Sequence, residues 1–322
     1  MRVLVTGTSG FIGHHCIQQL SERGHEPICL ARPQTERSKL PSETEVRESS
    51  YDDPEGLKKA CAGVDAVLHC AGIVRATSLD KYWKANVAAT RNLCEAAVSS
   101  GVERFVFISS LAAGGRSKRG EPRNETHPDE PLTWYGLSKF AAELAVRGLF
   151  RNYTILRPCA VYGPREKDIY RALKTLKQRG LDLRPGRTQP QLSLVHGEDV
   201  ALAASVCLEC GDSAAKTYYL SDGESREWDD FISYAARELG VEYKTRRMPE
   251  WVADLYAFAG YFIGRFTGKP VLVSPEKLFE MKQEACGSSV KKLENDTGFR
   301  PRYDLAKGIR DTVKWYTENG WL

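Results

Sequence analysis

The sequence has little excess of charge of either sign. Its 46 Lys and Arg residues against 42 Asp and Glu residues give a formal net charge of +4 over 322 residues. This is too little for a nucleic-acid groove, so we expect no nucleic-acid partner. No apolar run reaches the roughly 18 residues that a membrane-spanning helix needs. Disorder, collagen and a coiled coil are excluded by a composition that is 42% hydrophobic and 27% charged.

The nine cysteines lack the paired spacing of a disulfide framework or a zinc site. The tightest pair, Cys207 and Cys210, has neither a second pair nor histidines nearby. Such cysteines favour reduced thiols in a reducing compartment, and we expect no metal site. The first residues run directly into a glycine-rich turn, which leaves no room for a signal peptide. We therefore expect a cytoplasmic protein.

The first half of the chain alternates strand-like and helix-like segments. Short apolar runs rich in β-branched residues predict strands at Arg2–Thr6, Pro27–Ala31, Asp65–Cys70, Arg104–Ser109 and Tyr153–Leu156. Segments with helical periodicity lie between them. This alternation predicts an α/β fold, a Rossmann-like doubly wound parallel sheet with helices on both faces.

The alternation ends near residue 164. We predict a dinucleotide-binding domain over residues 1–164, to which 191–212 returns, and a smaller mixed α/β substrate-binding domain over 165–322. The most apolar part of the second domain is Trp251–Phe266, whose large side chains recur at helical spacing. A buried helix is the favoured interpretation. A lid over an apolar substrate and a surface that rests on a membrane are the alternatives.

A glycine-rich turn separates the first strand from the first helix. Glycines here permit a tight turn, close approach of the backbone to a pyrophosphate, and close packing of the helix on the strand. Amides at the start of the helix then point at the phosphate. The turn predicts a dinucleotide site, and the residues expected to bind the cofactor are Gly7, Ser9, Gly10, Phe11, Ile12 and Gly13.

The end of the second strand bears on the choice of dinucleotide. Enzymes selective for NAD usually carry an acidic residue there, which bonds the ribose hydroxyls. This chain has Ala31 followed by Arg32. A guanidinium suits a 2′-phosphate, so we predict NADP(H) as the preferred cofactor, with NAD(H) possible. A solvated arginine without a ligand is the alternative.

Tyr135 and Lys139 are four residues apart in a segment with helical periodicity, which places them on one face. A phenol has a pKa near 10, and a neighbouring ammonium lowers it toward neutrality. An accidental pair is the alternative. The pair comes one element after a strand that ends in Ser109 and Ser110. Ligands of doubly wound folds bind outside the carboxyl ends of the strands, so the pair is a candidate for proton transfer.

These motifs together resemble a known family. They are Gly7-x-x-Gly10-x-x-Gly13, His69-Cys70-Ala71-Gly72, Asn86-Val87, Ser109-Ser110, Tyr135-x-x-x-Lys139 and Arg157-Pro158-x-x-Val161-Tyr162-Gly163-Pro164-Arg165. Their order and spacing resemble an extended short-chain dehydrogenase/reductase, the group that includes NAD-dependent epimerases and dehydratases.

The resemblance implies a role for each matching residue. Tyr135 would donate or accept the proton, Lys139 would lower its pKa and hold the nicotinamide ribose, and Ser110 would bond the substrate oxygen. Ser109 is the alternative to Ser110. Asn86 would tie the sheet to its neighbouring helix. The remaining cofactor residues would be Ala71, Gly72, Pro158 and Val161. A homodimer is the family expectation, formed by the helices near Trp83–Ser99 and Tyr135–Phe150.

Departures from the family pattern concern the substrate. Gly114 and Gly115 stand where the family usually has Tyr-Gly, which predicts a roomier or more mobile pocket mouth. Leu192 stands where nucleotide-sugar enzymes often have a diphosphate-binding arginine, although Arg184 and Arg187 could compensate. The basic residues before the tyrosine favour a solvated loop, with contact to a substrate anion as the alternative; they are Arg116, Lys118, Arg119 and Arg123.

The sequence therefore predicts an NADP(H)-dependent oxidoreductase that interconverts a ketone and a secondary alcohol on an apolar or mixed-polarity small molecule. The alternative is a nucleotide-sugar epimerase or dehydratase in which hydride transfer to the bound cofactor is transient.

Overall fold

The computed structural model describes residues 1–186, 188–268, 271 and 274–322. Its centre is a seven-stranded parallel sheet in the order β10-β6-β5-β4-β1-β2-β3. The strands are β1 (Arg2–Thr6), β2 (Glu26–Ala31), β3 (Glu45–Glu48), β4 (Ala66–His69), β5 (Arg104–Ile108), β6 (Tyr153–Pro158) and β10 (Lys216–Leu220). The predicted α/β class and all five predicted strands are confirmed. The edge strand β10 was not predicted, and it lies beyond the segment 191–212 that was expected to return.

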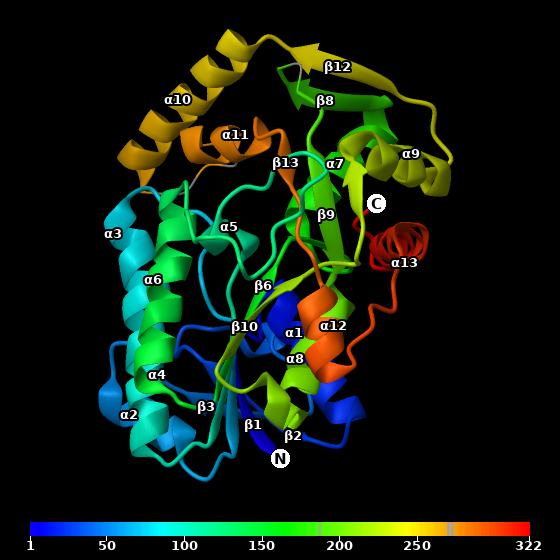
Figure 1. The fold of residues 1–322 in the computed structure, drawn as a ribbon. Helices are drawn as coiled ribbons and strands as arrows, with labels where there is room; N and C mark the ends of the chain where they lie inside the picture. The colour runs from blue at the N-terminus through cyan, green and yellow to red at the C-terminus, as the bar shows by residue number, and fades with distance from the viewer. Residues whose placement is uncertain (187, 269–270, 272–273) are drawn as a thin grey trace.

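Helices cover both faces of this sheet (Figure 1). One face carries α1 (Phe11–Glu22), α8 (Gly197–Glu209) and α12 (Lys291–Thr297); the other carries α2 (Pro54–Cys61), α4 (Ala89–Ser99) and α6 (Trp134–Leu149). Alternate residues of β1 supply the two cores, because successive strand side chains point to opposite faces. Val3 and Val5 pack on the α1 side, and Leu4 packs on the α4 side.

The long helical segment before β5 changes its winding along its length. It begins as α3 (Leu79–Tyr82), continues as a π-helix over Trp83–Ala88, and ends as α4. π-Bulges of this kind often occur at functional sites. The short helix α5 (Leu111–Gly114) follows β5, and 3₁₀ turns lie at Arg37–Lys39 and Gly211–Ser213.

The C-terminal part is a smaller α/β region. Its strands are β7 (Ala160–Tyr162), β8 (Leu181–Pro185), β9 (Gln191–His196), β11 (Ser225–Glu227), β12 (Lys244–Met248) and β13 (Ala285–Cys286). Its helices are α7 (Lys167–Arg179), α9 (Trp228–Leu239), α10 (Glu250–Thr267), α11 (Pro275–Met281) and α13 (Leu305–Glu318). β9 pairs with β7, β11 and β13, and β8 pairs with β12. The domain boundary at residue 164 stays a prediction.

Two further expectations concern the cysteines, which we expect to be reduced thiols, and membrane-spanning helices, of which we expect none. All nine cysteines fall in the described ranges and all are free. Among the described residues, no helix combines the length and the apolarity needed to cross a bilayer.

Candidate active site

The glycine-rich turn has the shape that a pyrophosphate requires. Gly7 has a φ of 71°, and a Cβ there would lie 2.9 Å from the amide nitrogen of Ala71. A Cβ on Gly13 would lie 2.3 Å from the Gly7 carbonyl oxygen, so only glycine lets α1 pack this closely on β1. Ser9 and Gly10 are exposed at the start of α1. The Ser9 amide is therefore available to an anion at the positive end of the helix, whereas the Gly10 amide donates to the Gly7 carbonyl at 2.9 Å.

The loop after β4 lies beside this turn, because β4 and β1 are neighbours in the sheet. The Thr6 hydroxyl oxygen accepts hydrogen bonds from the amides of Cys70 and Ala71, at 3.1 and 3.0 Å. Gly72 follows, and a Cβ on it would lie 3.1 Å from Asn86 Oδ1 and 3.8 Å from Lys139 Nζ. Ala71 and Gly72 thus stand between the glycine-rich turn and the lysine.

Asn86, within the π-helix, joins this loop to α6. Its Oδ1 accepts from the Ile73 amide at 2.8 Å, and its Nδ2 donates to the Ile73 carbonyl at 3.1 Å and to Ser138 Oγ at 2.9 Å. Asn86 is buried. It links the sheet edge to the helix of Tyr135 and Lys139, as the resemblance implied.

Tyr135, Lys139 and Ser110 lie around the carboxyl end of β5. Thr133 caps α6 by accepting a hydrogen bond from the Gly136 amide at 3.1 Å, which starts the helix just before Tyr135. The buried Lys139 ammonium donates to the Ile108 carbonyl at 2.7 Å and lies 4.2 Å from the centre of the Phe107 ring. Ser110 is the first residue past this strand that faces Tyr135, and its side chain bonds the phenol.

The pKa of Tyr135 differs from the sequence-based prediction. Burial raises the pKa of Tyr135 to about 12, and the hydrogen bond with Ser110 only partly opposes this. Burial also lowers the pKa of Lys139 to about 8, against the attraction of Glu143. That Lys139 lowers the pKa of Tyr135 stays a prediction. The ammonium is directed to the Ile108 carbonyl, and burial of the phenol dominates.

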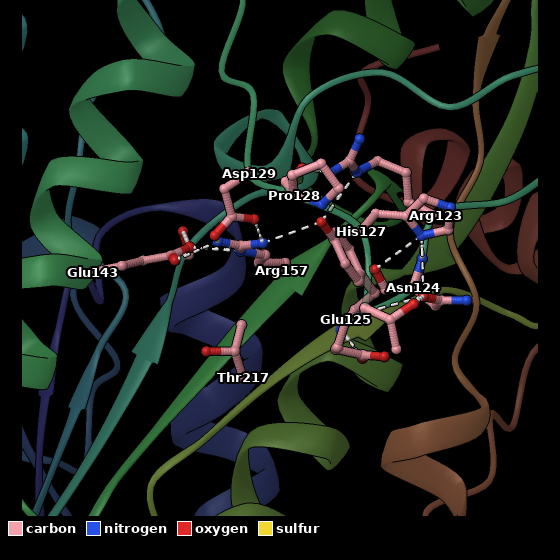
Figure 2. Close-up of polar contacts among 12 residues, drawn as sticks. Arg123, Asn124, Glu125, His127, Pro128, Asp129, Glu143, Arg157 and Thr217 are labelled. Atoms are coloured by element: carbon pink, nitrogen blue, oxygen red, sulfur yellow. Dashed lines mark hydrogen bonds and ion pairs between the residues drawn. The ribbon is translucent and has the colours of Figure 1, made fainter.

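The two serines after β5 have different surroundings. Ser109 is buried, and its hydroxyl donates to Glu143 Oε1 at 2.5 Å. Glu143 also accepts from Arg157 Nε at 2.8 Å and Nη2 at 2.7 Å, and Arg157 bonds Asp129 on its other side (Figure 2). Ser109 therefore belongs to a buried ionic network below the site, and Ser110 is the serine beside Tyr135.

The predicted roomier mouth at Gly114 and Gly115 is wrong. A Cβ on Gly114 would lie 1.9 Å from the Tyr219 hydroxyl oxygen, and one on Gly115 would lie 2.3 Å from the Glu130 carbonyl oxygen. Both glycines are buried. The space that a side chain would occupy is filled by Tyr219 from β10, the strand that sequence analysis missed.

The other predicted cofactor residues lie at the same edge of the sheet. Arg32 is exposed directly after β2, on the far side of β1 from β4. Pro158 ends β6, the neighbour of β5, and Val161 follows in β7. Phe11 and Ile12 begin α1 and are half-buried. The predicted positions thus follow the carboxyl ends of β2, β1, β4, β5 and β6 in succession.

Two carboxylates of α11 were not predicted and lie over the start of α6. Glu276 accepts a hydrogen bond from the Trp134 amide at 2.5 Å, and Glu280 accepts from the Thr133 hydroxyl at 3.3 Å. The negative charge of Glu280 contributes to the raised pKa of Tyr135. No motif marks these glutamates, because they come from more than 140 residues further along the chain.

Of the two arginines considered for a diphosphate, the structure describes Arg184. Arg184 is 5% exposed and forms ion pairs with Asp182 and Asp229. Leu192 lies on β9, opposite Arg226 of β11 and Cys286 of β13. Arg187 lies outside the described residues.

The basic loop before α6 is only partly solvated. Arg116, Lys118 and Arg119 are exposed. Arg123 is 5% exposed, and the solvated interpretation is wrong for it. Its Nε donates to the Tyr219 hydroxyl at 3.2 Å and its Nη1 to the Arg116 carbonyl at 3.0 Å. Arg123 fixes the loop that leads to Tyr135.

One other cluster of potential ligands occurs in the described part of the chain. His196, Glu198 and Asp311 place one ligand atom each within 4.8 Å of one another. Glu198 already accepts a hydrogen bond from the Tyr303 hydroxyl at 2.7 Å. The group is separate from the residues around Tyr135.

A glycine-rich turn at the point where the strand order reverses, with a tyrosine, a lysine and a serine around the next strand end, defines a nicotinamide-dinucleotide enzyme on a doubly wound sheet. Comparison with known proteins agrees. Residues 3–220 match the model of the NAD dependent epimerase/dehydratase family, and the chain belongs to this family. It is an NAD(P)-dependent enzyme of the extended short-chain dehydrogenase/reductase type.

Relatives with different activities are similar to this chain over most of their length. The chain is 27% identical to ceramide reductase of Caulobacter vibrioides, covering 99% of this chain and 96% of that one. It is 31% identical to the decarboxylating sterol-4-alpha-carboxylate 3-dehydrogenase of Dictyostelium discoideum, covering 74% and 76%. Among solved structures, the dTDP-glucose 4,6-dehydratase DesIV of Streptomyces venezuelae, with NAD bound, has a TM-score of 0.82 at 25% identity, covering 100% and 98%.

Proposed function

We propose that this enzyme uses NADP(H) to interconvert a ketone and a secondary alcohol on an apolar or mixed-polarity small molecule. The observation that carries the proposal is the Tyr135 phenol beside Ser110 at the carboxyl end of β5. A phenol with a pKa of about 12 is protonated at neutral pH. The protonated phenol can donate to a carbonyl oxygen in reduction of the ketone, and its raised pKa makes it a weaker acid than a free phenol.

Each residue of the site has one task in this proposal. Ser110 bonds the carbonyl oxygen of the substrate and holds it toward Tyr135, which transfers its proton to that oxygen. Lys139 is held by the Ile108 carbonyl and bonds the ribose next to the nicotinamide. The nicotinamide, when bound, supplies the hydride or accepts it.

The glycine-rich turn fits a dinucleotide because Gly7 and Gly13 leave no room for a Cβ and Ser9 and Gly10 are exposed. In the proposal these residues, with Phe11 and Ile12, hold the pyrophosphate. Ala71 and Gly72 would contact the dinucleotide next to this turn, and Pro158 and Val161 would contact the nicotinamide. Arg32 bonds the 2′-phosphate, and its exposure after β2 leaves it accessible to that group.

Charge around the site favours a substrate without a diphosphate. Leu192 offers no guanidinium, and Arg184 is already paired with two aspartates. Glu276 and Glu280 bring negative charge to the start of α6, which disfavours an anionic group beside Tyr135. The names of two relatives, a ceramide reductase and a sterol-carboxylate dehydrogenase, are consistent with a lipid-like substrate.

The alternative is a nucleotide-sugar epimerase or dehydratase. It is favoured by the likeness over the whole chain to the dTDP-glucose 4,6-dehydratase, whose structure holds NAD. Such an enzyme would turn over a UDP- or dTDP-sugar without net change of the cofactor.

Steady-state assays of the full chain separate the two functions. We expect consumption of NADPH with apolar ketones and no turnover of UDP- or dTDP-sugars. Tyr135→Phe should lower kcat about 100-fold or more while NADPH binding, followed by its fluorescence, is unchanged. Tyr234→Phe on α9, an exposed tyrosine, is the matched control. Turnover of a nucleotide sugar with no net oxidation of NADPH would overturn the proposal, and full activity in Tyr135→Phe would overturn the role of Tyr135.

A further inference from the structure

The helix α10 buries its small side chains and exposes its large apolar ones, which is the reverse of an ordinary surface helix. Its buried residues are small: Ala253, Ala257 and Gly264. Its exposed residues are large and apolar, and their exposed fractions are Trp251 70%, Leu255 63%, Tyr256 61%, Phe258 55%, Phe262 54%, Ile263 58% and Phe266 90%. A globular helix normally buries its apolar stripe. The favoured prediction of a buried helix is therefore wrong.

These exposed side chains form one broad stripe along the helix. At 3.6 residues per turn, Trp251, Leu255, Phe258, Phe262 and Phe266 fall on one face, and Tyr256 and Ile263 widen it. The 18 residues of α10 make a rod about 27 Å long. An apolar stripe of this length on a protein surface marks an interaction site.

The stripe faces away from the active site. The small residues of α10 pack toward α11, and Glu276 and Glu280 of α11 bond Trp134 and Thr133 at the start of α6 (Figure 1). The order outward from Tyr135 is thus α6, α11 and α10. A lid would turn its apolar side chains toward the substrate, so this arrangement does not fit a lid over Tyr135.

Cations accompany the stripe. The strand β12 runs into α10 through Pro249, and its exposed residues Lys244, Arg246 and Arg247 are basic, with no acidic residue in the strand. Lys244 and Arg246 pair with Leu181 and the exposed Leu183 of β8. On α10 itself, Asp254 pairs with Lys282 at 2.7 Å, and the exposed Glu250 in the first turn is matched in number by the exposed Arg265 in the last turn. The surface therefore combines exposed aromatic side chains with positive charge.

We propose that α10 and β12 form a surface that binds an anionic lipid bilayer, with the apolar stripe of α10 entering the headgroup region and the cations of β12 bonding lipid phosphates. Aromatic side chains beside basic residues are the composition of helices that lie in the membrane interface. A second copy of this chain fits less well. A two-fold contact through the stripe would leave the cations of β12 without anionic partners, because an isologous contact places the same surface on both copies.

Membrane binding would place the start of α6, which carries Tyr135, on the side of the molecule nearest the bilayer, because α11 alone separates α10 from it. An apolar substrate would then reach Tyr135 from the membrane. This consequence rests on the proposed function, whereas binding of the surface to lipid does not depend on it.

Flotation of the full chain with vesicles tests the proposal. We expect the protein to float with vesicles of phosphatidylcholine mixed with phosphatidylglycerol, and to bind pure phosphatidylcholine about 10-fold more weakly. Phe262→Ser/Phe266→Ser should weaken binding to the mixed vesicles about 10-fold or more. Lys244→Glu/Arg246→Glu should remove the preference for phosphatidylglycerol and its sensitivity to salt. Tyr234→Ser, which removes an exposed aromatic residue on α9, is the control and should bind as the wild type does.

Thermal unfolding and NADPH binding of each variant, unchanged from the wild type, show that the variants are folded and that their loss is specific to the surface. Failure of the wild-type protein to bind either vesicle overturns the proposal, and so does wild-type binding by the Phe262/Phe266 variant. Conversion of a larger oligomer to a smaller one by that variant, without lipid, would assign the stripe to contacts between copies. None of these readouts requires turnover, so they separate this proposal from the proposed function.

Discussion

At the scale of single residues, Arg32 bears most directly on whether the enzyme prefers NADP(H) or NAD(H). It follows β2 directly and is exposed, where a 2′-phosphate would carry two negative charges. Nothing else in the described site distinguishes NADPH from NADH as clearly, and a solved relative holds NAD. The proposed preference for NADP(H) therefore depends on one guanidinium.

Arg32→Asp should reverse the preference for NADPH. The carboxylate would repel the 2′-phosphate and bond the ribose hydroxyls of NADH, so the ratio of kcat/KM for NADPH to that for NADH should fall about 100-fold or more. Steady-state kinetics with both cofactors measures this ratio. Arg37→Asp, which removes a nearby exposed arginine, is the control and should change the ratio little. An unchanged ratio in Arg32→Asp would mean that NADP(H) is not the preferred cofactor.

His69, at the end of β4, links β1 to α4. Thr6 Oγ1 lies 2.7 Å from its Nδ1, and Thr90 Oγ1 lies 2.8 Å from its Nε2. Thr6 Oγ1 already accepts from two amides, so its hydroxyl donates to Nδ1 and the ring is neutral with the proton on Nε2. Burial and the charge of Lys139 lower the pKa of His69 to about 3.

This lowered pKa should destabilise the protein in acid. The unfolded chain binds a proton at His69 below pH 6.5, whereas the folded chain stays neutral until about pH 3, so stability falls as the pH falls through this interval. The loss from His69 should reach about 2 kcal/mol at pH 5. Urea unfolding at pH 7 and pH 5 measures it. His69→Gln should reduce the difference between the two pH values, and the exposed His127→Gln should not. An equal difference in all three proteins would contradict the assignment.

The motif residues of the site were predictable from the sequence because the requirement for each one arises from the backbone at its own position or a few residues away. Gly7 and Gly13 are required by the backbone at their own positions, and the four-residue spacing of Tyr135 and Lys139 is a property of any helix. Glu276 and Tyr219 were not predictable in the same way. They reach the site from distant segments, and their effects on Tyr135 and Gly114 depend on packing that has no sequence pattern.

At the scale of elements, the helix α6 and the strand β6 are joined by buried charge. Glu143 of α6 and Arg157 of β6 are 0% and 3% exposed, and they share two hydrogen bonds (Figure 2). Asp129, at 2.9 Å from Arg157 Nη2, adds the loop before α6 to the same unit. The carboxylates satisfy the guanidinium, so the network fixes the helix that carries Tyr135 against the sheet.

Glu143→Gln should destabilise the fold by about 3 kcal/mol or more, because it leaves a buried guanidinium with incomplete neutralisation and disturbs the bond from Ser109. The comparison is Glu95→Gln on α4, whose ion pair with Arg91 is exposed and should contribute less than about 1 kcal/mol. Urea unfolding of both variants at pH 7 gives the two values. Similar values would show that the buried pair contributes no more than a surface pair.

Strands and helices were predictable from the sequence where their hydrophobic pattern matched the side chains that are buried in the structure. The β-branched runs of β1, β4 and β5 are buried on both faces, as central parallel strands are, and the sequence indicates them clearly. β10 contains Lys, Thr and two tyrosines instead, and its tyrosines are buried by the loops and helices around them. The helix α10 has helical periodicity, which correctly predicts its winding. Periodicity does not tell which face is covered, and here the small residues are inside.

At the scale of the whole molecule, the outer surface formed by α4 and α6 bears on assembly. Leu137 and Leu144 of α6 are 39% and 50% exposed and are seven residues apart, on one face of the helix. Val98 of α4 is 48% exposed on the neighbouring helix. Two copies could pair these helices into a four-helix bundle, as the family expectation has it.

We therefore predict a homodimer that Leu137→Glu/Leu144→Glu converts to a monomer, because the two-fold interface would bring four buried carboxylates together. Sedimentation velocity at micromolar concentration measures the state of both proteins. Phe262→Ser/Phe266→Ser on α10 is the control and should leave the dimer intact. A wild-type protein that sediments only as a monomer would remove the prediction.

The helix α6 leaves little room for sequence drift. Its 16 residues present Tyr135 and Lys139 to the chemistry, Glu143 to the arginine of β6, Ser138 to Asn86, and Leu137 and Leu144 to the outside. A substitution on any side of this one rod therefore meets a separate demand: turnover, folding or assembly. In a library of random single substitutions scored for growth, this helix should tolerate fewer replacements than the solvent-facing helix α9, and its rate of change among descendants should be among the slowest in the chain.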